Sequence, residues 1–198
     1  MTQAPQEHQP LIRRILGANY LELSLSRLRV DEEPDVATVV KVSVNEAGQP
    51  VEVDGRGVGV VDALFAGLLG RYAVEYTSLR SIDFAGFSVS ADFDTKKNKT
   101  GLDAVGTVTI DVTNSEGRRF TFSDASRSVT ASTARAVLAV VQYFVNSERA
   151  FITLYNARKD AISRGRDDLL SRYTAELSEV VESTSYTSVI EGFRKERG

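Results

Sequence analysis

The stretch Gly55-Arg-Gly-Val-Gly-Val-Val-Asp-Ala-Leu-Phe-Ala-Gly-Leu-Leu-Gly-Arg-Tyr72 decides the fold, because its pattern changes from that of a turn to that of a helix. The glycine cluster at its start marks the turn. From Val60 onward, apolar residues recur at three- and four-residue spacing and predict one buried helix face. That face is expected to consist of Val61, Leu64, Phe65, Leu68, Leu69 and Tyr72. Asp62 lies in the first turn of the helix, where a negative charge complements the helix dipole.

Three short segments upstream alternate apolar and polar side chains with the period of two that half-buried strands show. They are residues 20–26, 36–44 and 50–54. A charged turn at 31–35, which contains a proline, and a hairpin-type turn at 45–48 separate them. These tight connections predict an antiparallel meander with one solvated face.

The same plan repeats downstream, with Asp62 matching Ala131 at a separation of about 69 residues, and such repetition indicates internal pseudo-symmetry. Strand signals occur in residues 74–93, 104–113 and 119–122, and a long amphipathic helix is predicted over about 129–161. We therefore predict the α+β class, with two pseudo-symmetric βββα units whose helices pack on antiparallel sheets, plus a C-terminal helix.

The chain is predicted to divide into a flexible tail, one two-unit domain and an extension. The breaker Ser163-Arg-Gly165 marks the end of the long helix. The parts are a tail at 1–10, a regulatory-type domain at 11–161 (unit one 19–73, unit two 74–161) and a helical C-terminal extension at 162–198.

Composition excludes several classes of function. The chain has 198 residues, a net charge of −3, no cysteine and a single histidine, His8. Disulfides, cysteine zinc sites, a Ser-His-Asp triad and a multi-histidine metal site are therefore not expected, and no cofactor is predicted. The basic residues are scattered, so nucleic acid is not an expected partner. Because no window approaches the roughly 20 apolar residues of a membrane helix, and the start lacks a signal-peptide pattern, we expect a cytoplasmic protein without a membrane partner.

Three motifs occur in order on the expected elements. They are Gly57-Val-Gly-Val-Val-Asp-Ala-Leu64, Gly101-Leu-Asp-Ala-Val-Gly-Thr-Val-Thr-Ile110 and the pair Ala131-Ser132. Together they resemble the C-terminal regulatory domain of 2-isopropylmalate synthase, which citramalate synthase shares, over roughly residues 19–160. The chain departs from the family pattern at Val60, where the family has proline, and at Arg127, where it has an acidic residue.

The resemblance implies a fold that dimerises and binds a feedback effector near the dimer interface, through the two strand-to-helix turns. Carried onto this chain, the effector contacts are Gly57, Val58, Gly59, Val60, Asp62, Ala63, Thr130, Ala131 and Ser132. The family's catalytic barrel of about 250 residues has no room here, so the chain is not expected to be an enzyme. The expected function is that of a stand-alone regulatory domain of leucine biosynthesis, a homodimer that binds a small amino acid or related acid and acts in trans on a partner synthase.

The chemistry of the turns suits such a ligand, but a structural interpretation stays open. A helix N-terminus can hold a carboxylate, and Asp62 can receive an ammonium group. Alternatively, the glycines only permit a tight turn, Asp62 supports the start of the helix, and Thr130 and Ser132 are helix caps. The alternative function is a non-catalytic dimerisation or protein-interaction module with a decayed ligand site, which Val60 and Arg127 favour.

Overall fold

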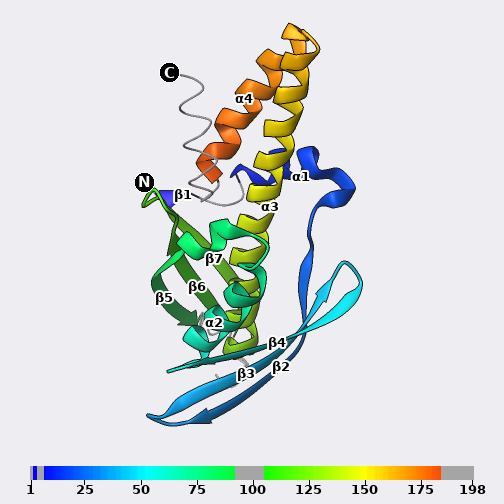
Figure 1. Ribbon diagram of the computed structural model, residues 1–198. Coiled ribbons are helices and arrows are strands. Elements are labelled where there is room, and N and C mark those ends of the chain that lie inside the picture. Colours follow the sequence, from blue (N-terminus) through cyan, green and yellow to red (C-terminus); the bar gives the residue numbers. More distant parts are fainter. Residues whose placement is uncertain (1, 4–6, 92–104, 184–198) are drawn as a thin grey trace.

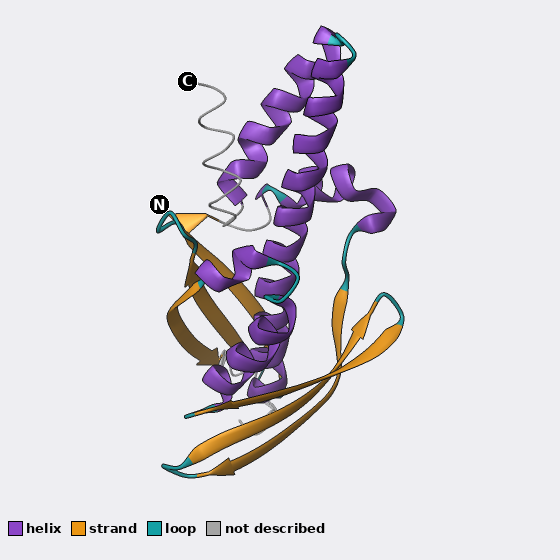
Figure 2. Cartoon of the chain, in the orientation of Figure 1, coloured by secondary structure: helices purple, strands orange, loops and turns teal. Residues whose placement is uncertain are grey.

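The computed structural model describes residues 2–3, 7–91 and 105–183. Two β-sheets face a layer formed by α2 and the first part of α3 (Figures 1 and 2). This α+β arrangement of two βββα units with added C-terminal helices confirms the predicted fold class. The elements are β1 (Thr2–Gln3), α1 (Gln9–Leu16), η2 (Gly17–Asn19), β2 (Leu23–Glu33), β3 (Ala37–Glu46), β4 (Gln49–Gly57), α2 (Val60–Tyr72), η3 (Thr77–Ser81), β5 (Asp83–Ala91), β6 (Gly106–Thr113), β7 (Arg119–Ser126), α3 (Val129–Ser163) and α4 (Asp167–Ser183).

Sheet one has the antiparallel order β2-β3-β4. The predicted alternation on β3 is confirmed, because Val40, Val42 and Val44 are fully buried. The β3–β4 hairpin turns through Ala47 and Gly48, both with positive φ. This two-residue geometry matches the right-handed twist of the flanking strands.

Strand β2 extends past the point where the sequence predicts a charged turn. Asp31, Glu32 and Glu33 still pair with β3, and the turn falls at residues 34–36. Nearer its start, β2 also has a register shift between Leu25 and Arg27, which inserts one extra residue. The shift breaks the simple period of two that the sequence shows.

Sheet two has the order β1-β7-β6-β5, in which β1 is parallel to β7 and the other pairs are antiparallel. Val108, Ile110 and Val112 of β6 are fully buried, as predicted. The strand predicted over 74–93 is shorter, because β5 begins only at Asp83 and η3 precedes it. The backbone N–H of Ser78 in η3 donates to Glu148 Oε2 at 3.0 Å, which fixes a turn where a strand was expected. The predicted loop at 94–101 lies outside the described residues.

The first long strand of each βββα unit, β2 or β5, has a bulge at an equivalent place. In β5 the register shifts between Phe84 and Gly86, as it does between Leu25 and Arg27 in β2. After the bulge, Leu28 of β2 pairs with Val42 of β3, and Phe87 of β5 pairs with Ile110 of β6. The equivalent pairs across the two units are Leu25 and Phe84, Leu28 and Phe87, and Val30 and Val89.

Helix α2 has the predicted bounds and lies unusually close to β4. A Cβ on Gly55 would overlap the carbonyl oxygen of Ala63, and one on Gly67 would lie 2.9 Å from the carbonyl oxygen of Asp54. Glycine at both positions therefore permits this approach.

The buried face of α2 is narrower than the sequence predicts. Leu64, Leu68 and Tyr72 are buried, together with Ala63 and Gly67, whereas the adjacent stripe of Val61, Phe65 and Leu69 is only partly buried. Both stripes satisfy a helical period. Only contact with β4 and α3 distinguishes them, and a pattern within one helix does not contain that information.

Helix α3 runs for 35 residues, and its second half projects beyond the sheets beside α4 (Figure 1). Gly165, with φ +65°, follows the end of α3, as the predicted break requires. Leu177 and Val180 of α4 are fully buried. The described part of the C-terminal extension thus packs in cis against its own chain.

The N-terminal segment is structured earlier than the predicted boundary at residue 10. Helix α1 begins at Gln9, His8 is only 7% exposed, and Thr2–Gln3 pair with β7. Leu11, Ile12 and Leu16 join the apolar core. The prediction rested on the polar composition of residues 1–10, and tertiary pairing and burial override it.

Candidate functional site

The first strand-to-helix turn joins β4 to α2 and is held by its own aspartate. The backbone N–H of Val58 donates to Asp62 Oδ2 at 3.0 Å. A Cβ on Gly57 would collide with that carboxylate oxygen and lie 2.6 Å from the backbone nitrogen of Ala63. Glycine at 57 and aspartate at 62 therefore form one structural unit, in which the carboxylate reaches back over the glycine.

The second turn joins β7 to α3 and is built from serines. Ser128 is the helix cap, and its Oγ accepts from the backbone N–H of Ala131 at 3.2 Å. The interpretation of Thr130 and Ser132 as caps is therefore wrong. Ser132 is fully buried, and its Oγ lies 2.8 Å from Ser126 Oγ. Serine is a preferred cap residue, but the sequence offers several serines and threonines here and does not choose among them.

An ion pair beside the second turn was not predicted from the sequence. Arg135 donates to Asp124 Oδ2 from Nε at 3.0 Å and from Nη2 at 2.8 Å, and Nη2 also lies 3.2 Å from Ser132 Oγ. Burial alone would raise the pKa of Asp124, but the hydrogen bonds from Arg135 and Ser132 hold that pKa below its usual value. Both groups are therefore charged at neutral pH. Asp124 and Arg135 meet only because the end of β7 lies beside the start of α3.

Two grooves lie between the first strand of one unit and the helix of the other. The β2–α3 groove, of about 410 Å³, is lined by Leu25, Ser26, Arg27, Leu28, Val30, Ser128, Thr130, Ala131 and Arg135. The β5–α2 groove, of about 650 Å³, is lined by Val61, Asp62, Phe65, Ala66, Leu69, Gly70, Ile82, Asp83, Phe84 and Phe87. The equivalence of β2 with β5 makes these grooves pseudo-symmetric counterparts.

The two grooves differ in chemistry. The β2–α3 groove combines an apolar wall with hydroxyl groups and the Arg135 guanidinium. The β5–α2 groove is mainly apolar, and the rings of Phe65 and Phe84 pack edge to face across it, with centroids 5.5 Å apart. A polar ligand with an apolar part therefore suits the first groove, and an apolar surface suits the second.

The predicted effector contacts line different grooves rather than one shared pocket. Thr130 and Ala131 line the β2–α3 groove, whereas Asp62 lines the β5–α2 groove. Ala63 and Ser132 are fully buried, so their side chains belong to the packing beneath each turn. Gly57, Val58, Gly59 and Val60 form the first turn itself, where Val58 is exposed and Val60 packs against the core.

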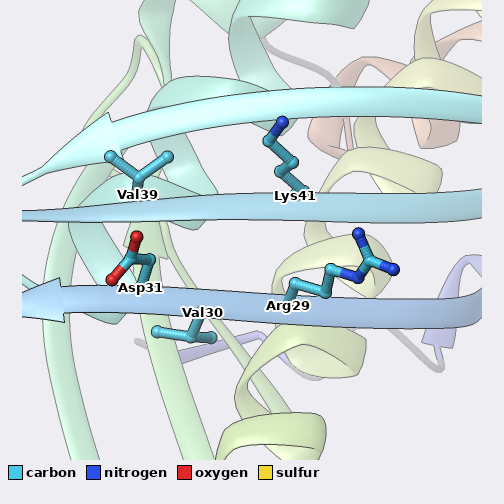
Figure 3. A pocket seen from close by; sticks show the side chains of 5 residues that line it. All are labelled: Arg29, Val30, Asp31, Val39 and Lys41. Carbon is cyan, nitrogen blue, oxygen red and sulfur yellow. The ribbon is translucent and has the colours of Figure 1, made fainter.

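A further hollow, of about 470 Å³, lies on sheet one and contains none of the predicted residues. Figure 3 shows Arg29 of β2 beside Lys41 of β3, and Asp31 beside Val39. The charged side chains of the hollow are Arg29, Asp31 and Lys41. These three side chains are exposed and carry both signs of charge. Such a surface is typical of the solvated face of an antiparallel sheet.

The described residues form neither a metal-binding cluster nor a membrane-spanning helix. Within residues 2–3, 7–91 and 105–183, no group of three or more His, Cys, Asp or Glu side chains is placed to hold a metal ion. None of the helices in these ranges combines the length and apolar character needed to cross a membrane.

Comparison with known proteins identifies a regulatory family. The family described as the LeuA allosteric (dimerisation) domain matches residues 4–145, which include sheet one, strands β5 to β7 of sheet two, α2 and the first half of α3. No curated protein matches the sequence. The match ends within α3, so the second half of α3 and all of α4 lie beyond it.

Proposed function

The chain belongs to the LeuA allosteric (dimerisation) domain family, and we propose that it is a regulatory domain that binds a small amino acid or related acid. We further propose that it forms a homodimer and acts in trans on a synthase. The observation that carries the effector part is the mixed chemistry of the β2–α3 groove.

That groove presents complementary groups for the carboxylate and the side chain of a free amino acid. The N-terminus of α3 carries a partial positive charge and favours a carboxylate, for which Arg135 would share its guanidinium with Asp124. Leu25, Leu28 and Val30 supply an apolar wall for the side chain. The volume of about 410 Å³ lies within the range of about 300–1,000 Å³ usual for small-molecule sites.

Asp62 of the first turn, the predicted partner of an ammonium group, lines the β5–α2 groove and would act on a ligand bound there. Its Oδ2 already accepts from the Val58 N–H, so a ligand would share the carboxylate with the backbone. The same hydrogen bond supports the second candidate function, a dimerisation or interaction module without a ligand. In that case Gly57 and Asp62 serve only to build the turn.

Thermal unfolding with leucine, isoleucine, valine and 2-oxoisovalerate, each in excess, separates these functions. A ligand that binds only the folded state stabilises it by about 2.7 kcal/mol at a hundred times its dissociation constant. A shift with one of them supports the effector domain. The absence of a shift with all four favours the interaction module.

Action in trans is tested by mixing the protein with a synthase, with and without effector. Gel filtration should show a complex, and the effector should change the activity of the synthase, because an effector acts only by binding two states of an assembly differently. No complex and no change in activity would exclude action in trans.

A further inference from the structure

Strand β5 is an outer strand that has a bulge near its start, between Phe84 and Gly86, but carries no charge or proline after Asp83. Its residues 84–91 read Phe-Ala-Gly-Phe-Ser-Val-Ser-Ala and contain no charge and no proline. Proteins commonly place charged side chains or proline on such edges to prevent pairing with another chain. The equivalent outer strand β2 follows that rule, because it carries Arg27, Arg29, Asp31, Glu32 and Glu33.

The inward face of β5 is only partly covered, although it continues the core face of sheet two. Phe84, Phe87 and Val89 pair with the fully buried Val112, Ile110 and Val108 of β6. They nevertheless remain 48%, 42% and 45% exposed. Together with the β5–α2 groove they form one apolar surface, and such surfaces on soluble proteins commonly mark interaction sites.

We propose that β5 and the β5–α2 groove form the surface through which two copies of this chain associate. The two β5 strands would lie antiparallel across a two-fold axis, which continues the antiparallel order of β5, β6 and β7. Phe84, Phe87 and Val89 of each copy would then lie beside those of the other. The inference rests on the dimerisation part of the proposed function and gives it a location.

The chemistry of the strand favours a second copy as the occupant. In a two-fold pair, each residue of β5 lies near residues of the same strand, so a charged strand would bring like charges together. The neutral run 84–91 has no such conflict, whereas a fully overlapping antiparallel β2–β2 pair would set Arg27 opposite Arg29 of the other copy. The family description itself names dimerisation, which points to self-association rather than to a different protein.

A matched pair of substitutions tests the location of the interface. Val89→Lys and Val30→Lys place the same charge at equivalent, partly exposed positions of β5 and β2. In sedimentation-velocity experiments we expect a dimer for the wild type and for Val30→Lys, and a monomer for Val89→Lys. A Val89→Lys protein that stays dimeric overturns the inference but leaves the proposed dimer in place.

Two further readouts guard against misfolding and separate the two proposals. Val89→Thr keeps the shape of valine and should weaken dimerisation by about tenfold, because a two-fold interface carries the substitution twice, while Val30→Thr should not. Circular dichroism checks that each variant keeps its helices. A monomeric wild type would overturn both the inference and the proposed homodimer. The β5–α2 groove would then have to be covered by something other than a second copy of this chain. Effector binding would still be decided independently by thermal unfolding.

Discussion

The side-chain amide of Asn146 pairs with the backbone of Leu21 as a neighbouring strand would. Asn146 Oδ1 accepts from the Leu21 N–H at 2.8 Å, and Nδ2 donates to the Leu21 carbonyl oxygen at 2.8 Å. One helical turn earlier, Gln142 Oε1 accepts from the Leu23 N–H at 2.7 Å. Helix α3 of unit two therefore holds the entry of β2 in unit one, and these contacts couple the two units.

Asn146→Ala should destabilise the fold strongly, because it leaves the buried backbone groups of Leu21 without their partners. The expected loss is about 3 kcal/mol, since each unsatisfied buried group costs about 1–3 kcal/mol. Gln142→Ala is the matched control and should cost about 1 kcal/mol, because its single bond to Leu23 is only partly buried. Urea unfolding at constant pH measures both values. Equal losses for the two variants would contradict the special role of Asn146.

Gly57→Ala should destabilise the protein by about 2 kcal/mol, as overpacking of a tight site does. The new Cβ would displace the Asp62 carboxylate from the Val58 N–H. Gly59 provides the control, because a Cβ there meets nothing within 4 Å and its φ of −160° is ordinary extended backbone. Gly59→Ser should stabilise α2 by about 0.3 kcal/mol, since serine is a slightly better cap than glycine. Thermal unfolding of the two variants gives the comparison, and a tolerated Gly57→Ala would refute the close packing of this turn.

The sequence correctly predicts the helices and strands whose apolar pattern lies within the element itself. The alternation in β3 and β6, the bounds of α2 and the break after α3 depend on local periodicity and on glycine, and the structure confirms them. The bulged path of β2 and the turn in η3 depend on partners far along the chain, such as Glu148 for Ser78, and were predicted incorrectly.

The candidate site shows the same limit. The sequence identifies the two turns, and the structure gives each its own construction. The sequence does not reveal that each groove combines the strand of one unit with the helix of the other. Asp124 and Arg135 illustrate the reason, because each is an ordinary charged residue until β7 and α3 place them 2.8 Å apart. The contrast between the uncharged run 84–91 of β5 and the charged β2 is visible in the sequence, but its meaning depends on knowing that both are outer strands.

Acid should weaken the fold partly through Asp124. Its pKa is lower in the folded protein than its ordinary value of about 3.9, so the unfolded chain binds more protons in this range. The stabilisation is therefore fully present above about pH 4 and is lost as the pH falls through the folded pKa. Because both partners are partly exposed, the contribution is about 0.5–1 kcal/mol. Asp124→Asn should flatten the fall in the free energy of unfolding between neutral pH and pH 3, and an unchanged slope would remove Asp124 from this account.

Leu177→Ala should loosen α4 from α3, because the leucine side chain is fully buried. Large-to-small changes at such positions cost about 2–5 kcal/mol. Leu170→Ala, at a half-buried position of the same helix, should cost clearly less. Hydrogen exchange of α4 amides locates the effect. Faster exchange in α4 with little change in β3 and β6 is expected, since α4 packs mainly against α3.

The effector proposal leads to a test that distinguishes the two grooves. Thr130→Phe adds bulk at an exposed position on the wall of the β2–α3 groove, and Val61→Phe adds bulk at the equivalent position of the β5–α2 groove. If an amino acid binds beside the start of α3, Thr130→Phe should abolish the ligand-induced stabilisation of about 2.7 kcal/mol expected at a hundred times the dissociation constant. Val61→Phe should retain it. Thermal unfolding without ligand checks that Thr130→Phe itself leaves the fold unchanged, as expected for an exposed helix position. The opposite result, with stabilisation lost only in Val61→Phe, would move the effector to the groove that Asp62 lines and would make the carboxylate of Asp62 the next position to substitute.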